Sequence, residues 1–123
     1  MKRKILIVDD NIHMVEIVRF KLLEQGFEVI TAHNGQEGLE KVKTHQPDLI
    51  ILDVLMPRLT GLEMKEKLKE GDLTKDIPII FITSSLENDN EKRIDLMSEG
   101  YVVLDKIVEL EDLFSSIKKL FNY

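Results

Sequence analysis

Residues 47–57 read PDLIILDVLMP, and positions 49–52 within this stretch are all leucine or isoleucine. A short run that is apolar at every position is typical of a strand covered on both faces, as in a parallel sheet flanked by helices. Asp53 follows this run directly. The stretch therefore predicts an inner strand with a carboxylate at its carboxyl end.

Other short apolar runs lie on both sides of this one, with longer amphipathic segments between them. We predict strands at 4–8, 27–31, 49–52, 77–82 and 101–104, and helices near 12–25, 35–45, 62–70, 89–99 and 109–121. Strict alternation of this kind predicts β-α-β units around a parallel sheet. Right-handed crossovers leave few topologies, and we expect an α/β fold with a doubly wound five-stranded sheet, order 2-1-3-4-5, and five flanking helices.

The predicted helices differ in how clearly the sequence indicates a buried face. The last helix has one apolar stripe at helical spacing, formed by Leu110, Leu113, Phe114, Ile117, Leu120 and Phe121. The helix near 89–99 has only three apolar side chains, so we expect it to be the least firmly docked. Gly26, Gly71 and Gly100 stand at predicted helix ends, where a positive φ is expected.

The composition limits the class of protein. A chain of 123 residues, 43% hydrophobic and 33% charged, is expected to form one domain over residues 1–123 and to bury about two thirds of its unfolded surface. A net charge of -6 argues against direct nucleic-acid binding as the main activity. The absence of cysteine excludes a disulfide framework and cysteine-ligated zinc. The apolar run at 5–8 is too short for a signal peptide or membrane span, so we expect a cytoplasmic protein without a membrane partner.

Polar residues stand at the carboxyl ends of four predicted strands. Asp9 and Asp10 follow the first strand, Asp53 the third, Thr83 the fourth and Lys106 the fifth. In the predicted order, strands 1 and 3 are neighbours, and ligands bind beyond their carboxyl ends. Three carboxylates gathered there repel one another and need a cation. Oxygen ligands without histidine or cysteine favour Mg²⁺, and a metal held in this way can orient a phosphate.

Each of these residues also has an ordinary structural interpretation. Asp10 with Asn11 could cap the helix that follows, and an aspartate after a strand is usually a turn residue. Thr83 could simply end a strand, and Lys106 could be a solvated surface lysine. The combination favours a site, because four of five strand ends carry residues that suit one phosphoryl-transfer centre. The three histidines show no ligand spacing and receive no role.

With these residues in view, the chain resembles the receiver domains of bacterial two-component signalling along its whole length. The matching segments are ILIVDDN at 5–11, PDLIILDVLMP at 47–57, Gly61, PIIFIT at 78–83, and Lys106. The acceptor stretch at 53–57 with Gly61 behind it is the most specific part of the match. The resemblance implies the flavodoxin-like form of the doubly wound fold.

The resemblance also implies which oxygens react and which bind metal. Asp53 would attack the phosphoryl group of a phosphohistidine on a sensor histidine kinase or phosphotransfer protein and become an acyl phosphate. Asp10 and Asp53 would bind one Mg²⁺ directly, and the backbone carbonyl of Leu55 would be a further protein ligand. Asp9 would act mainly through bound water.

Other matched positions would serve the phosphoryl group and the response to it. Thr83 would hydrogen-bond the phosphoryl oxygens, Lys106 would pair with the acceptor and then with the phosphoryl group, and the small Ser84 would leave room for the donor. Repacking of the face at 89–121 would then signal to a downstream partner protein. The chain would be a phosphoacceptor that assists its own phosphorylation and dephosphorylation, and not an enzyme with a separate substrate.

Positions 107, 103 and 55 affect which properties of the family can be expected of this chain. Ile107 follows Lys106 where family members usually have proline, often after a cis peptide bond, so we expect a trans or strained bond here. Val103 occupies the usual place of the switch aromatic, and Tyr101 lies two residues earlier. The apolar Leu55 leads to the hypothesis that the acyl phosphate is shielded from water and long-lived.

Two other functions remain open. A magnesium-dependent phosphatase with an aspartyl nucleophile would have Asp-x-Asp after the first strand and a cap insertion, whereas this chain has adjacent Asp9 and Asp10 and no room for a cap. A receiver-like interaction module that is never phosphorylated is favoured by Ile107 and Val103. We expect a phosphorylation-dependent receiver.

Overall fold

The computed structural model describes residues 2–56, 58–83, 90–105 and 110–121. Within this part of the chain, strands and helices alternate strictly, as the sequence predicts. The elements are β1 Lys4–Val8, α1 Ile12–Glu24, β2 Glu28–Ala32, α2 Gly35–His45, β3 Leu49–Asp53, α3 Gly61–Glu70, β4 Ile79–Thr83, α4 Asn90–Ser98, β5 Val102–Asp105 and α5 Leu110–Phe121.

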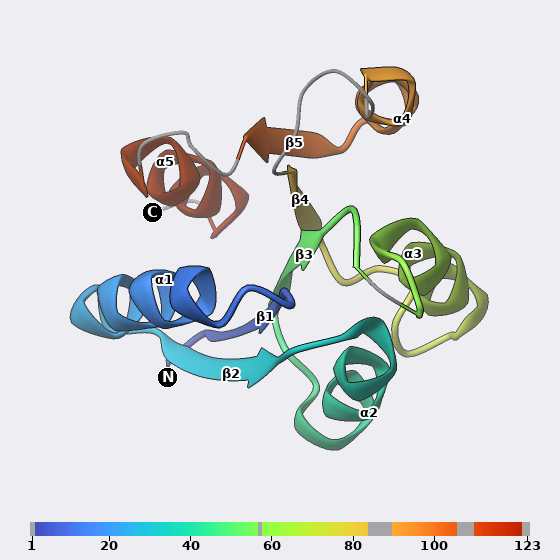
Figure 1. Cartoon of the computed structure of the whole chain (residues 1–123). Coiled ribbons are helices and arrows are strands. Elements are labelled where there is room, and N and C mark those ends of the chain that lie inside the picture. The colour runs from blue at the N-terminus through green and yellow to red at the C-terminus, as the bar shows by residue number, and fades with distance from the viewer. Residues whose placement is uncertain (1, 57, 84–89, 106–109, 122–123) are drawn as a thin grey trace.

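The strands form one parallel sheet in the predicted order, β2-β1-β3-β4-β5. Figure 1 shows α1 and α5 on one face of this sheet and α2, α3 and α4 on the other. This is the flavodoxin-like doubly wound arrangement, in which the strand order reverses between β1 and β3. The predicted fold class is confirmed.

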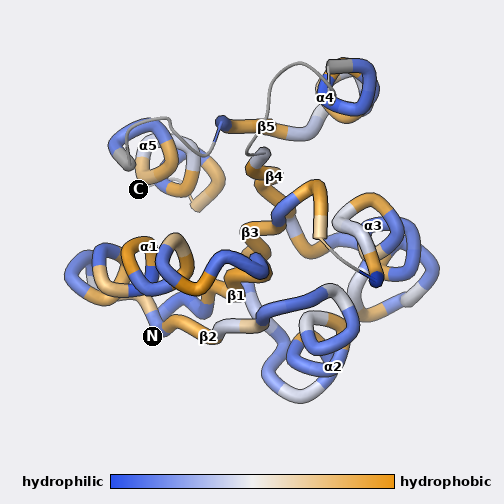
Figure 2. The backbone as a smooth tube through the Cα atoms, viewed as in Figure 1, coloured by the Kyte–Doolittle hydropathy of each residue, from blue (hydrophilic) through white to orange (hydrophobic). Residues whose placement is uncertain are grey.

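The apolar runs of the inner strands supply two cores, one on each face of the sheet. In β3, Ile50 and Leu52 pack into the core beneath α2, α3 and α4, while Leu49 and Ile51 pack into the core beneath α1 and α5. All residues of β3 and β4 are buried, which explains why these strands lack an alternating pattern. Figure 2 shows the hydrophobic residues concentrated along these strands.

Several expectations about helix ends and faces need correction. Gly26 and Gly100 have positive φ angles of 91° and 96°, as predicted, but Gly71 does not. Its φ is -94° and its backbone is extended, because the chain leaves α3 through a turn in which Thr74 donates a hydrogen bond to Leu68. A glutamine, Gln46, takes the left-handed conformation at the end of α2.

The predicted stripe on α5 is correct only in part. Leu113, Ile117 and Phe121 are buried, but Leu120 is 41% exposed and does not belong to the stripe. Leu120 lies about 100° around the helix from Phe121, at the border of the buried face. On α4, Leu96 is the one fully buried side chain among those described, in agreement with the weak apolar pattern of this helix.

Candidate metal centre

The register of β1 and β3 brings two aspartates together. Val8 pairs with Leu52, so the next residues along the two parallel strands, Asp9 and Asp53, lie side by side at the carboxyl edge of the sheet. Side chains alternate between the faces of a strand. Asp53 therefore points to the same side as Ile51, toward the core beneath α1 and α5.

Three carboxylates meet at this edge. Asp9, Asp10 and Asp53 each offer one oxygen, and these oxygens all lie within 4.8 Å of one another. Asp9 and Asp53 are buried, whereas Asp10 is exposed. The structure thus brings together the three acids that the sequence predicts as one site.

Backbone amides orient the two buried carboxylates. The N–H of Asn11 donates to Oδ1 of Asp9 at 3.0 Å, and the N–H of Leu55 donates to Oδ1 of Asp53 at 3.3 Å. Each carboxylate accepts from the residue two positions later, as aspartates commonly do in turns. The same loop that positions Leu55 therefore orients the predicted acceptor.

The helix-capping interpretation of this segment applies to Asn11 and not to Asp10. Oδ1 of Asn11 accepts a hydrogen bond from the N–H of Met14 at 3.1 Å and caps α1. Within the described part of the chain, Asp10 makes no hydrogen bond or ion pair. Its carboxylate is directed to the acidic cluster, as a metal ligand requires.

Gly61 allows the start of α3 to pack closely against the backbone at the end of β3. Its N–H donates to the carbonyl oxygen of Val54 at 3.0 Å, so the start of α3 lies against the backbone that follows β3. A Cβ atom at Gly61 would collide with the carbonyl oxygen of Asp53. Only glycine permits this close approach, and it ties α3 to the backbone of Asp53.

Thr83 ends β4 at the same edge of the sheet. It is 1% exposed, and its neighbour in the strand, Ile82, pairs with Asp53. This placement agrees with the predicted role near the acceptor, which stays a prediction. Lys106, like Ser84 and Ile107, lies outside the described residues.

The carbonyl of Leu55 also stays a prediction as a metal ligand. Leu55 contacts the site through its amide, which donates to Asp53, and its side chain is 38% exposed.

The donor set fits magnesium. All three groups are carboxylates, the hard oxygen ligands that Mg²⁺ prefers, and Mg²⁺ commonly takes only one or two of them directly and keeps several waters. Two of the acids are buried, where neighbouring negative charges repel strongly unless a cation neutralises them. An acidic cluster of this kind can hold a divalent cation next to Asp53.

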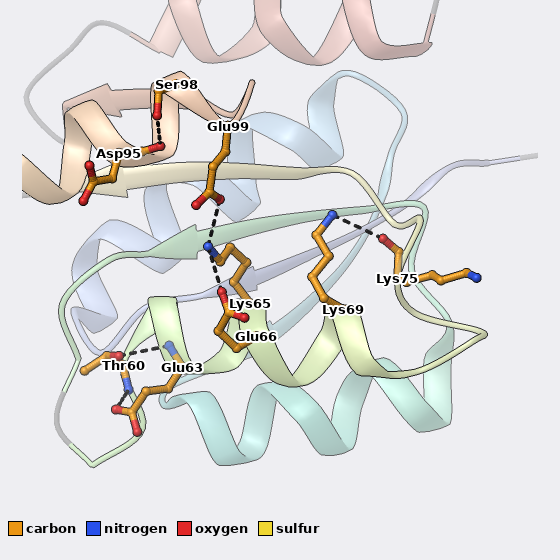
Figure 3. Close-up of polar contacts among 9 residues, drawn as sticks. All are labelled: Thr60, Glu63, Lys65, Glu66, Lys69, Lys75, Asp95, Ser98 and Glu99. Atoms are coloured by element: carbon orange, nitrogen blue, oxygen red, sulfur yellow. Dashed lines mark hydrogen bonds and ion pairs between the residues drawn. The ribbon is translucent and has the colours of Figure 1, made fainter.

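A second polar cluster, which the sequence does not predict, links α3 to the end of α4 (Figure 3). Nζ of the buried Lys65 lies 3.0 Å from carboxylate oxygens of both Glu99 and Glu66. The same ammonium lies 5.6 Å from the centroid of the Tyr101 ring, which packs edge-on against Phe81 of β4. Burial lowers the pKa of Lys65, but the hydrogen bonds and charges of the two glutamates outweigh it and raise the pKa above its ordinary value.

Comparison with known proteins agrees with this geometry. The family described as "Response regulator receiver domain" has a sequence model that matches residues 5–118. The chain belongs to this family. Receiver domains are phosphoacceptors of two-component signalling and act as phosphorylation-dependent switches, so the family predicted from the sequence is confirmed.

Curated relatives of this receiver domain are response regulators. It is 38% identical over 103 residues to the alkaline phosphatase synthesis transcriptional regulatory protein PhoP of Bacillus subtilis, matching 83% of this chain and 42% of PhoP. It is 35% identical over 94 residues to the polar-differentiation response regulator DivK of Brucella anthropi, which covers 76% of each protein. The chain thus spans less than half of PhoP but about three quarters of DivK.

Solved structures of receiver domains have the same fold. Chemotaxis protein CheY4 of Vibrio cholerae superposes with a TM-score of 0.85 at 31% identity, over 97% of this chain and 98% of that one. Response regulator TrrA of Thermotoga maritima, solved in complex with Mg²⁺-BeF, gives 0.82 at 34% identity, over 96% and 98%. In the described part of this receiver domain, no helix is long and apolar enough to cross a membrane.

Proposed function

We propose that Asp53 is the phosphoacceptor of this receiver domain and that one Mg²⁺ supports the transfer. The observation that carries the proposal is the meeting of Asp9, Asp10 and Asp53 within 4.8 Å, with Asp53 buried at the end of the central strand. The Mg²⁺-BeF complex of TrrA supports the choice of metal by similarity. Asp10, Asp53 and the carbonyl of Leu55 would hold the ion, and Asp9 would act mainly through bound water.

The chemistry assigns a distinct task to each side chain. An oxygen of Asp53 forms a bond to phosphorus while the bond between phosphorus and the histidine nitrogen of the donor breaks, and the imidazole keeps the electron pair and takes up a proton. When bound, the metal ion supplies positive charge to the oxygens of the transferring group. Thr83 would donate a hydrogen bond to a phosphoryl oxygen, and Lys106 would neutralise its charge.

The three acids differ in a way that favours Asp53 as the nucleophile. Asp10 is exposed, and Asp9 follows the end of β1, whereas Asp53 is the last residue of β3. Asp53 comes from the strand at the centre of the sheet, and its orientation is set by the amide of Leu55. A buried nucleophile whose position is fixed before the donor arrives lowers the entropic cost of the reaction.

The proposal includes the partners and the site of action. A sensor histidine kinase or a phosphotransfer protein would be the donor, in the cytoplasm, where the ATP that loads such a kinase is found. The phosphorylated chain would signal to an output protein through the face at 89–121. Exposed apolar side chains on three consecutive elements of this face support the choice: Ile94, Met97, Val102 and Leu120.

A receiver-like module that is never phosphorylated is the second candidate. Val103 is buried in the core, and the aromatic side chain of this strand region, Tyr101, packs against Phe81. Because no aromatic side chain occupies position 103, the aromatic switch usual in the family cannot operate there in its usual form.

Intact-mass measurement after incubation with acetyl phosphate and MgCl₂ tests both candidates. We expect one added phosphoryl group on the wild-type chain and none on Asp53→Asn. Asp48→Asn makes the same change at the other end of β3, where Asp48 accepts a hydrogen bond from the N–H of Lys4, and should be phosphorylated normally. No adduct on the wild-type chain would support the interaction module, and an adduct that persists in Asp53→Asn would assign the acceptor elsewhere.

A further inference from the structure

A groove between α2 and α3 takes no part in the proposed phosphorylation site. Its volume is about 850 Å³, which lies in the range of small-molecule pockets, roughly 300–1,000 Å³. α2, α3, the loop before α3 and the turn after it form the walls. The apolar side chains that line the groove are Leu39, Val42, Leu59, Leu68 and Leu73.

A well-defined turn holds one leucine at the rim of this groove. Leu73 is 86% exposed, the highest value among the described large apolar side chains. Its neighbour Thr74 donates from Oγ1 to the carbonyl of Leu68 at 2.5 Å, and the carbonyl of Gly71 accepts from the N–H groups of Thr74 and Lys75. The hydrogen bonds of this turn therefore hold the side chain of Leu73 in its exposed position. A ligand in the groove would cover it.

Three cations surround the groove. Lys43 comes from α2, Arg58 from the loop before α3, and Lys67 from α3. Within the described residues, none of them forms an ion pair, whereas the one lining carboxylate, Asp72, lies 4.0 Å from Lys75. In a chain with a net charge of -6, this local excess of positive charge favours an anionic ligand.

The shape and the side chains favour a long aliphatic ligand. A smaller hollow of about 170 Å³ shares Val42, Lys43, Leu73 and Thr74 with the groove and extends it to Gln46. From residue 36 in α2 to residue 46, just after this helix, the groove runs for about 15 Å, at 1.5 Å per helical residue. No aromatic side chain is among the described lining residues, so a flat base would find no ring to stack on.

We propose that this groove binds an amphipathic anion of the long-chain carboxylate class. The alkyl chain would cover the leucines along α2, α3 and the turn, and the carboxylate would pair with the cations of the rim. A single ionised head group matches unpaired cations that stand above an apolar floor. This binding does not depend on phosphorylation, so it can fail or succeed independently of the proposed switch.

Amide chemical shifts of the full ¹⁵N-labelled chain, titrated with decanoate below its micelle concentration and without a phosphoryl donor, test the proposal. We expect saturable shifts on α2, α3 and the turn at 71–75, with a dissociation constant below about 1 mM. Dodecanoate should bind about tenfold more tightly, because two more methylene groups are buried. Decanol and decyltrimethylammonium, with the same chain length but no negative charge, should bind at least tenfold more weakly.

Two kinds of variant distinguish the contribution of charge to decanoate binding from the contribution of apolar contact. The double change Lys43→Glu and Lys67→Glu should weaken decanoate binding at least tenfold, whereas Lys118→Glu with Lys119→Glu makes the same charge change on α5 and should have no effect. Leu73→Ser should weaken binding severalfold and leave thermal unfolding unchanged, since its side chain is exposed. Equal affinity for the cationic amphiphile, shifts centred on the exposed Phe20 of α1, or no saturation would overturn the proposal.

Discussion

Lys65 on α3 and Glu99, the residue after α4, are joined by an ion pair of 3.0 Å, and the lysine side chain is only 8% exposed. This contact ties the end of α4, which has one buried residue among those described, to α3, which has four. Lys65 also contacts Glu66 at 3.0 Å, so the lysine keeps one partner when the other is removed.

We predict that a double-mutant cycle between Lys65→Met and Glu99→Gln gives a coupling of about 0.5–1 kcal/mol in urea unfolding at pH 7. The value is modest because Glu99 is half exposed and solvent screens the pair. The exposed pair of Lys75 and Asp72, at 4.0 Å, is the matched control and should show less coupling. Equal coupling in both pairs would show that the burial of Lys65 adds nothing.

The pH dependence of this coupling follows from the raised pKa of Lys65. A lysine whose pKa is higher in the folded than in the unfolded state contributes stability that is fully present below the unfolded value, about 10.4. That contribution is lost as the pH rises through the folded pKa. The effect of Glu99→Gln on the free energy of unfolding should therefore be constant from neutral pH to about pH 9 and decline above about pH 10.5.

Gly61→Ala should destabilise the domain and impair the site. The new Cβ would collide with the carbonyl of Asp53, so α3 or the acceptor backbone must shift, at a cost of about 2–3 kcal/mol. Gly26→Ala is the matched control, because its φ of 91° is unfavourable for alanine but its Cβ would meet nothing within 4 Å. We expect about 1–2 kcal/mol for Gly26→Ala and normal phosphorylation by acetyl phosphate. Slower phosphorylation should be confined to Gly61→Ala.

Asp10→Asn should stabilise the metal-free domain and remove its response to Mg²⁺. The carboxylate of Asp10 lies within 4.8 Å of two others but is exposed, so relief of repulsion is worth about 1 kcal/mol at low salt. In the wild type, Mg²⁺ at ten times its dissociation constant should add about 1.4 kcal/mol of stability. Urea unfolding with and without MgCl₂ measures both effects. Asp72→Asn, which changes a carboxylate that is 98% exposed, should retain the Mg²⁺ response.

Leu55→Asn should shorten the lifetime of the acyl phosphate severalfold, if the acceptor is Asp53. The amide of Leu55 donates to this carboxylate, and its side chain is 38% exposed at the edge of the site, where it can exclude water. Leu23→Asn replaces a leucine of similar exposure, 44%, on α1 and should leave the lifetime unchanged. The decay of the phosphorylated mass after removal of acetyl phosphate gives both rates. Identical decay in the two variants would reject the shielding hypothesis.

The sheet and its acidic edge could be predicted because parallel strands obey simple geometric rules. The run at 49–52 is apolar throughout, since helices cover both faces of β3, and this alone places it inside the sheet. Once β1 and β3 are neighbours in equal register, Asp9 and Asp53 must lie together. The prediction of the site thus depended on strand ends, which are local in the sequence, and on a strand order that general topology rules limit to few choices.

Features that depend on distant partners could not be predicted. Lys65 looks like a solvated lysine on α3, and its burial depends on Glu99, which is 34 residues away in the sequence. Gly71 stands where a helix-ending glycine is expected, but the hydrogen bonds of the Thr74 turn give it an extended backbone. The groove beside α3 likewise requires two stretches of the chain, 36–43 and 58–74, and leaves no local pattern.

The close contact between Gly61 and the Asp53 carbonyl fixes the first residue of α3 against the backbone of β3. The helix runs from Gly61 to Glu70, about 15 Å, and its near end bears directly on the backbone of the acceptor. A tilt of α3 by about 10° about its Gly61 end would move its Glu70 end by about 2.5 Å. The turn at 71–75 follows the far end of α3 directly, so such a tilt would move this turn as well.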